Sequence, residues 1–333
     1  MSKRKIGIVI CLCIAMLAIA TMTGCGGGGS EDAASGDATY KVGIVQQMEH
    51  AALDAATQGF QDALVDALGE GNVEFINQNA QNDTAACTTI INDFVTKKVD
   101  LIMANATPAL QAAANGTATI PVLGTSVTEY GTALDIKDFD GLVGTNVSGT
   151  SDLAPLDQQA AMILELFPDA KTVGMLYCSA EANSKYQVKV IKEALEAKGV
   201  TCTDYPFSDS NDVASVAKAA AAASDVIYVP TDNTAASCTE AINGAVLPTK
   251  TPIVAGEEGI CKGCGVATLS ISYYDLGVAT GKMAAKILKG EEKVEEMEIA
   301  YAETFTKKYN KTICGELGID TATLEAAGYI AIE

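Results

Sequence analysis

An internal duplication limits the possible folds of this chain more than any other feature. Residues 171–195 (KTVGMLYCSAEANSKYQVKVIKEAL) align with residues 41–64 (KVGIVQQMEHAALDAATQGFQDAL), each with a short β-type run, a polar loop and apolar residues at helical spacing. Residues 211–237 align in the same way with residues 82–111, and each of these segments begins with Asn-Asp and leads into an apolar strand. We therefore expect two copies of one lobe.

Each copy alternates extended and helical segments in the order βαβαβα. This order predicts a parallel, doubly wound sheet with helices on both faces, because parallel strands need a crossover connection. The predicted fold class is therefore α/β, with two doubly wound parallel-sheet lobes joined by a hinge around a ligand cleft. The expected bounds are 40–147 with about 273–300 for the first lobe, and 148–272 with about 301–333 for the second.

The N-terminus has the features of a lipoprotein signal. MSKRK is basic, IGIVICLCIAMLAIA is apolar but short for a membrane span, and MTGC places small residues before Cys25. We expect residues 1–24 to be a signal peptide, Cys25 to carry lipid, and residues 25–39 to be a flexible, glycine-rich tether. An ordinary signal peptide and an uncleaved anchor are the alternatives. The expected location is extracytoplasmic, with a lipid anchor in the cell membrane.

The charge balance argues against polyanionic partners. The chain has 22 basic and 42 acidic residues, and loss of Lys3, Arg4 and Lys5 with the signal would change the formal charge from −20 to −23. Nucleic acid and anionic lipid surfaces are poor partners for such a chain. Arg4 is also the only arginine, so a ligand carboxylate would be held by hydroxyls, amides, backbone N–H groups or a lysine.

Polar residues cluster where the predicted strands end, as in YVPTDNTAAS at 228–237. In an open parallel sheet, ligands bind outside the carboxyl ends of the strands, next to helix N-termini. One Ser, Thr, Asp or Asn is enough to cap a helix, so three polar residues in a row favour ligand contact over capping alone. The predicted ligand-binding residues are Gln46, Glu49, His50, Thr107, Thr128, Glu129, Ser179, Glu181, Asn183, Ser184, Thr231, Asp232, Asn233, Glu257 and Glu258.

Catalytic and metal chemistry find little support in the sequence. His50 is the only histidine, so a His-rich metal centre is impossible and a Ser-His-Asp set would depend on His50 alone. Cys261 and Cys264 have Cys-x-x-Cys spacing without further ligands, and we expect a loop disulfide or free thiols. No catalytic residue, metal site or cofactor is expected.

Several motifs resemble one family of binding proteins. They are KVGIVQQMEHAALDAATQGF, ANATPAL, GTSVTE, VSGTSDLAP, YCSAEANS, YVPTDNT and YYDLGVATGKMAAKIL, and they extend from about Lys41 to Lys289. Together they resemble the ABC-transporter substrate-binding lipoproteins associated with tryptophan and tyrosine uptake.

This resemblance implies a type I periplasmic-binding-protein fold, whose two lobes close over an aromatic or other hydrophobic amino acid, with an ABC permease and ATPase as partners. Many relatives carry aspartate-containing loops where this chain has GTSVTEYG and AGEEGICKGCG, so the ligand ammonium would meet Glu129, Glu257 or Glu258. Sensing for a membrane receptor, and a nucleoside or other small polar solute as ligand, are the alternatives. An aromatic ligand would stack on Tyr130, Tyr186, Tyr273 or Tyr274.

Overall fold

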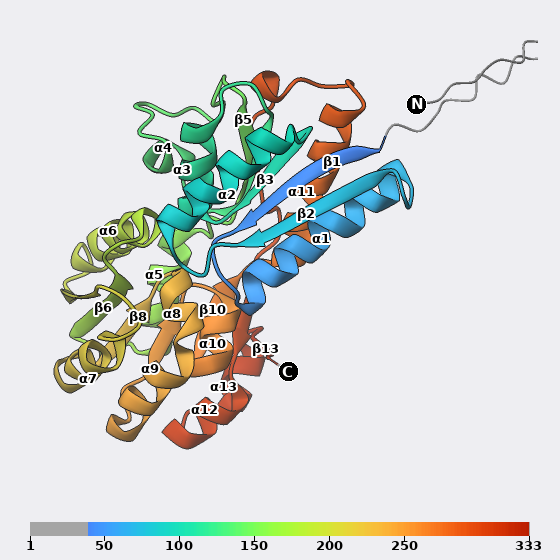
Figure 1. Ribbon diagram of the computed structural model, residues 1–333. Helices are drawn as coiled ribbons and strands as arrows, with labels where there is room; N and C mark the ends of the chain where they lie inside the picture. Colours follow the sequence, from blue (N-terminus) through green and yellow to red (C-terminus); the bar gives the residue numbers. More distant parts are fainter. Residues whose placement is uncertain (1–38, 333) are drawn as a thin grey trace, which may run out of the picture. The chain divides into compact units, whose positions relative to one another are not determined.

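Two β-sheets organise the residues that the computed structural model describes, 39–332 (Figure 1). The first sheet has the strand order β11-β5-β4-β3-β1-β2, and the second has the order β13-β12-β10-β9-β8-β6-β7. All pairs of the first sheet are parallel. In the second sheet, β12 pairs antiparallel with β10 and the other pairs are parallel. The duplication in the sequence thus corresponds to two doubly wound sheets.

The strands are short, as is usual for such sheets. Those of the first sheet are β1 (Tyr40–Gln46), β2 (Val73–Asn79), β3 (Leu101–Asn105), β4 (Val122–Val127), β5 (Val147–Ser151) and β11 (Ala300–Tyr301). Those of the second sheet are β6 (Thr172–Cys178), β7 (Thr201–Phe207), β8 (Val226–Val229), β9 (Ile253–Ala255), β10 (Ala267–Ser270), β12 (Thr306–Tyr309) and β13 (Ile330–Ala331).

Helices connect most of the consecutive strands. Those of the first half are α1 (Ala51–Leu68), α2 (Thr84–Lys97), α3 (Thr107–Gly116) and α4 (Tyr130–Ala133). Those that follow are α5 (Leu156–Leu166), α6 (Ala182–Glu196), α7 (Val213–Ala223), α8 (Asn233–Ser237), α9 (Thr239–Val246), α10 (Glu258–Cys264), α11 (Tyr273–Leu288), α12 (Lys311–Leu317) and α13 (Thr321–Ala326). Two 3₁₀ turns, η1 (Leu247–Thr249) and η2 (Val294–Glu296), complete the described elements.

Both faces of each sheet are covered because successive strand residues point to opposite sides. In β3, Ile102 and Ala104 pack into the core beneath α2 and α3, whereas Leu101 and Met103 pack into the core beneath α1 and α11. The second sheet repeats this arrangement. Its strands β6 and β8 divide their apolar residues between the core shared with α5 and α6 and the core shared with α7, α9 and α10. Strands buried on both sides explain the continuous apolar runs in the sequence.

Helix α11 returns to the first sheet and packs along α1 (Figure 1). The two helices approach closely through glycines, because a Cβ atom at Gly277 would lie 2.0 Å from the Ala56 carbonyl oxygen and one at Gly59 would lie 2.1 Å from that of Tyr274. The chain then adds β11 to the first sheet and crosses to the second, where β12 and β13 end it. Three segments therefore connect the sheets, after β5, before α11 and after β11.

The first sheet includes β5 and therefore extends to Ser151, beyond the expected lobe bound at residue 147. The division of the described residues into two lobes stays a prediction. The predicted signal peptide, Cys25 and the tether, except for its last residue, lie outside the described residues. Among residues 39–332, no helix combines the length and the apolar character that crossing a membrane requires.

Candidate functional site

The loops at the carboxyl ends of the two sheets enclose a small cavity of about 10 Å³. It lies where α1, α8, α10 and α11 begin, as expected for a ligand site in sheets of this type. Its lining residues are His50, Ala52, Leu53, Asp152, Thr231, Asp232, Asn233, Ala236, Glu257 and Tyr273. The structure thus brings together five of the predicted site residues, namely His50, Thr231, Asp232, Asn233 and Glu257.

His50 joins the two sides of the cavity. Its Nε2 atom lies 3.2 Å from Oδ1 of Asn233, whereas its side chain makes no capping hydrogen bond to α1. Burial lowers the pKa of His50, against the opposing effects of Asn233, Glu181 and Asp54, so the ring is neutral at pH 7. A second hydrogen bond between the sides runs from Asn82 Nδ2 to the Thr234 hydroxyl, at 3.3 Å.

The carboxylate of Asp232 is fully engaged within the protein. Oδ1 accepts from the backbone N–H of Ala235 at 2.8 Å and so caps α8, and Oδ2 accepts from Cys178 N and Ser184 Oγ, both at 2.7 Å. Burial is the main cause that raises the pKa of Asp232, and the nearby Glu181 carboxylate raises it further. Its contacts are those of a helix cap that also ties the loop to β6 and α6.

Glu181 holds the following residues of the same loop. Its carboxylate accepts hydrogen bonds from the backbone and side chain of Asn233, at 3.0 and 2.7 Å, and from the backbone and side chain of Thr234, at 2.9 and 2.8 Å. The Asn183 amide donates to Glu181 and to the Thr231 carbonyl, both at 3.1 Å. Glu181, Asn183 and Ser184 therefore position the Thr231–Thr234 loop, and none of the three lines the cavity.

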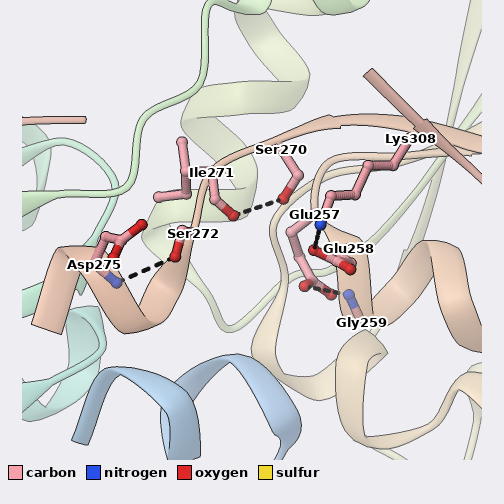
Figure 2. Close-up of polar contacts among 8 residues, drawn as sticks. All are labelled: Glu257, Glu258, Gly259, Ser270, Ile271, Ser272, Asp275 and Lys308. Carbon is pink, nitrogen blue, oxygen red and sulfur yellow. Dashed lines mark hydrogen bonds and ion pairs between the residues drawn. The ribbon is translucent and has the colours of Figure 1, made fainter. Parts of the chain in front are cut away.

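The three glutamates predicted to meet an ammonium have different surroundings. Glu129 caps α4 through hydrogen bonds from Gly131 N (2.8 Å) and Thr132 N (2.6 Å), and it does not line the cavity. Glu258 forms an ion pair with Lys308 at 2.5 Å (Figure 2). Glu257 alone of the three lines the cavity.

Glu257 also caps a helix, since it accepts from Gly259 N at 2.6 Å (Figure 2) and from Ile260 N. It is 3% exposed, and this burial raises its pKa to about 7 despite the two backbone donors. A carboxyl group at this position gains from a positively charged partner, because such a partner favours the ionised form.

The remaining predicted residues lie at strand ends but do not line the cavity. The Gln46 side chain bonds to Asp54 and Thr57, both at 2.7 Å, and the Ser179 hydroxyl donates to the Phe207 carbonyl at 3.0 Å. Among the predicted residues of the first sheet's loops, Glu49 is exposed, whereas Thr107 and Thr128 are buried.

Asp152, which the sequence reasoning missed, directly follows β5 and lines the cavity. It is 4% exposed; Oδ2 accepts from the Tyr273 hydroxyl at 2.9 Å, and Oδ1 has no hydrogen-bond partner. Burial raises the pKa of Asp152, and the nearby hydroxyls of Thr128 and Tyr273 oppose this rise. The sequence contains one indication of this role, because Asp152 lies at the end of a strand in the motif VSGTSDLAP.

The N-terminus of α1 lies on the same cavity through Ala52 and Leu53. The first backbone hydrogen bond of this helix is donated by Asp54 to the His50 carbonyl, and no side chain caps it. The N–H groups of its first turn are therefore available to an acceptor, and the helix dipole favours a negative one.

A groove of about 1110 Å³, larger than the cavity, lies between α2, α3 and residues 143–147. These residues lead into the amino end of β5, whereas Asp152 follows its carboxyl end, and Asp135 is the only ionisable residue that lines the groove. Ligand sites of such sheets lie at the carboxyl ends, so the small cavity is the candidate site.

The Cys-x-x-Cys pair lies in α10 and does not form a disulfide. Cys261 and Cys264 are free, buried thiols, and burial raises the pKa of both, which disfavours the reactive thiolate. Among residues 39–332, no three His, Cys, Asp or Glu side chains are grouped in a way that could hold a metal ion.

Comparisons with known proteins show which family this chain is similar to. The family described as ABC transporter substrate binding protein matches residues 41–326. A protein named tyrosine-binding protein, from Clostridioides difficile strain R20291, is 36% identical over 252 residues, which cover 75% of this chain and 73% of that protein.

Two solved structures have sequence identities to this chain close to that of the tyrosine-binding protein. An ABC domain in complex with L-Trp from Streptococcus pneumonia is 34% identical, with a TM-score of 0.83 and coverage of 89% of this chain and 100% of the other. The ligand-free, open structure of a substrate-binding protein with adhesive properties from Clostridium difficile is 36% identical, with a TM-score of 0.67 and coverage of 88% and 100%.

These matches confirm the resemblance inferred from the motifs and the predicted α/β fold of two doubly wound sheets, which is that of type I periplasmic binding proteins. The chain therefore belongs to the family of ABC transporter substrate-binding proteins.

Proposed function

We propose that this chain is the extracytoplasmic, lipid-anchored binding protein of an ABC importer, and that it captures an aromatic or other hydrophobic amino acid between its two sheets. The observation that carries the proposal is that two groups without hydrogen-bond partners lie on the same cavity. Asp152 Oδ1 is buried without a partner, and the N-terminus of α1 has no cap. One group suits a cation and the other an anion.

An amino-acid zwitterion satisfies both groups. Its ammonium would lie against Asp152, with Glu257 as a second acid, and its carboxylate against the first N–H groups of α1. Each such contact with a helix N-terminus contributes about 0.3–1 kcal/mol from the dipole alone. This arrangement replaces the guanidinium that would otherwise bind a carboxylate, since Arg4 is the only arginine of the chain.

Binding requires the two sides of the site to separate and close. A cavity of about 10 Å³ holds no more than one water molecule, so an amino acid enters only when the loops move apart. The three connecting segments provide a hinge for this motion.

The TM-scores are consistent with a hinge. At nearly the same sequence identity, this chain has a TM-score of 0.83 with the L-Trp complex and 0.67 with the ligand-free, open structure. The arrangement described here is therefore closer to the ligand-bound relative, in keeping with the hydrogen bonds from His50 and Asn82 across the site.

The anchoring and delivery steps rest on the sequence and on the family. The MTGC motif and the glycine-rich tether support lipid attachment at Cys25, which would hold the binding protein next to its permease and ATPase. Membership of the substrate-binding family supports a role in binding without catalysis. The names of the relatives, which mention tyrosine and L-Trp, support an aromatic ligand.

Isothermal titration with L-tryptophan, L-tyrosine, L-phenylalanine and L-leucine tests the proposal. We expect the wild type to bind at least one of them, and Asp152→Asn to lose about 1.5–3 kcal/mol of binding free energy, the usual value of a hydrogen bond to a charged group. Asp157→Asn, an exposed aspartate on the following helix, is the matched control and should bind like the wild type. Equal affinity of Asp152→Asn and wild type would contradict the proposed site.

A further inference from the structure

One hydrogen bond between the loops of the two sheets is made entirely by residues that do not line the cavity. It runs from Nδ2 of Asn82, in the loop between β2 and α2, to the hydroxyl of Thr234 in α8, at 3.3 Å. Both residues thus lie outside the space in which the charged groups of the ligand are expected. The bond joins one side of the protein to the other without involving the ligand.

The Asn82 side chain is oriented by residues of its own side. Its backbone N–H donates to the Gln47 carbonyl at 2.8 Å, and its Oδ1 accepts from Gln47 Nε2 at 3.0 Å. Gln47 is buried, and its Oε1 accepts in turn from the Cys87 thiol at 3.1 Å. Because the amide oxygen of Asn82 is already engaged by Gln47, its Nδ2 group is the one presented to Thr234.

The Thr234 hydroxyl is oriented in the same way by the second side. Thr234 is buried, and its N–H and hydroxyl donate to Glu181 Oε1 at 2.9 and 2.8 Å. Since Glu181 takes the hydroxyl proton, the oxygen offers a lone pair to Asn82. The other oxygen of Glu181 accepts from Asn233, whose Oδ1 lies 3.2 Å from Nε2 of His50. One buried carboxylate therefore positions both acceptors that face the first sheet.

We propose that Asn82 and Thr234 form a latch, a contact that exists only when the two sides are closed and that raises the affinity for every ligand by the same factor. The inference rests on the proposed function, because it assumes that a ligand is held between the two sheets. It goes beyond that function by assigning part of the binding strength to residues that the ligand does not touch.

The orientation of both partners makes the latch favourable. Each group is held by hydrogen bonds within its own side, so closure costs little additional side-chain entropy. Release of the ligand requires the latch to open, because an amino acid cannot leave a cavity of about 10 Å³ while the two sides are together. A hydrogen bond of ordinary net strength corresponds to a change in affinity of about two- to tenfold.

A double-mutant cycle measures the latch in the whole protein. Asn82→Gly removes the donor and suits the φ of 63° at this position, whereas Thr234→Val removes the acceptor with little change in shape. In isothermal titration we expect Asn82→Gly to weaken the binding of L-tyrosine by about two- to tenfold. In the Thr234→Val background, the same substitution should have little further effect, because the contact is already lost.

The ligand series tests whether the latch acts without touching the ligand. L-Tyrosine, L-tryptophan, L-phenylalanine and L-leucine are titrated into the wild type and into both single variants. Each variant should weaken the binding of every amino acid that the wild type binds by the same factor. The affinity ratios between these amino acids should therefore stay at their wild-type values.

Gln81→Gly is the matched control. Gln81 is the neighbouring exposed residue of the same loop, and its φ of 53° is also in the left-handed region. This variant should bind like the wild type, so it separates the loss of the Asn82 side chain from the added freedom of a glycine in the loop. Thermal unfolding of all variants checks that each is folded.

The outcomes separate this inference from the proposed function. Wild-type affinity of Asn82→Gly, or an equal effect of this substitution with Thr234 and with Val at position 234, would overturn the latch while the binding of amino acids stands. Altered affinity ratios would show that these residues contact the ligand and would also overturn it. Failure of the wild type to bind any of the four amino acids would overturn the proposed function and the inference with it.

Discussion

Replacement of Asp232 by alanine tests whether this carboxylate stabilises the fold of the site. The substitution leaves the backbone N–H groups of Cys178 and Ala235 without their acceptor, and the Ser184 hydroxyl as well. Each buried donor left unpaired costs about 1–3 kcal/mol. The hydroxyl can rotate to another acceptor, and loss of the repulsion from Glu181 offsets part of the cost. We therefore expect a decrease of about 2–3 kcal/mol in the free energy of unfolding.

Urea unfolding followed by circular dichroism measures this difference. Asp320→Ala serves as the comparison, because Asp320 also caps a helix, α13, through Ala322 N at 3.0 Å but is exposed to solvent. This exposed cap should cost about 1 kcal/mol. If Asp232→Ala unfolds at the same urea concentration as the wild type, the three hydrogen bonds do not stabilise the loop, and the positioning role assigned to Asp232 is wrong.

Two further predictions concern the protonation of the site and its anchoring. Burial raises the pKa of Glu257 to about 7 from its ordinary 4.5, so the folded state binds more protons than the unfolded state between these values, and stability should fall as pH rises from about 4.5 to 7. Urea unfolding at pH 5 and pH 8 should show a smaller pH dependence for Glu257→Gln than for the wild type, and an equal dependence would argue against the raised pKa. For the anchor, Cys25→Ala should leave the precursor unprocessed or release the protein from the membrane in cell fractionation; normal processing and retention would exclude lipid attachment at Cys25.

The sequence predicted the architecture well because the fold follows from a pattern repeated along the chain. Apolar runs at strand and helix spacing occur in both copies, so the alignment of residues 41–64 with 171–195 identifies β1 with β6 and α1 with α6. The loops at strand ends follow from the same pattern, since parallel strands place their carboxyl ends at one edge of a sheet.

The sequence could not separate residues that face the cavity from residues that hold the loops. Glu129 and Glu257 each lie two residues after a strand and both cap the next helix, yet only Glu257 lines the cavity. This difference depends on how the two sheets are placed against each other, which local patterns do not encode. Glu181 likewise looks like a ligand contact in the sequence, but its carboxylate is engaged by Asn233 and Thr234.

Asp152 was missed for a related reason. The aligned segments of the two copies end before β5, so no repeat drew attention to the residue that follows it. Its importance appears only in three dimensions, where the chain leaves the first sheet and brings the carboxylate against the Tyr273 hydroxyl at 2.9 Å. A buried acid with one oxygen unpaired has no signature in a single sequence.

The central claim is that the site binds the two charged ends of an amino acid, and blocking each end in turn tests it most directly. Isothermal titration of the purified protein would compare L-tyrosine with its N-acetyl derivative, which lacks the ammonium, and with its amide, which lacks the carboxylate. We predict binding of L-tyrosine and a loss of at least tenfold in affinity for each derivative, in line with about 1.5–3 kcal/mol for a hydrogen bond to a charged group. Equal affinities for the amino acid and either derivative, or no binding of L-tyrosine and the other amino acids, would contradict the account.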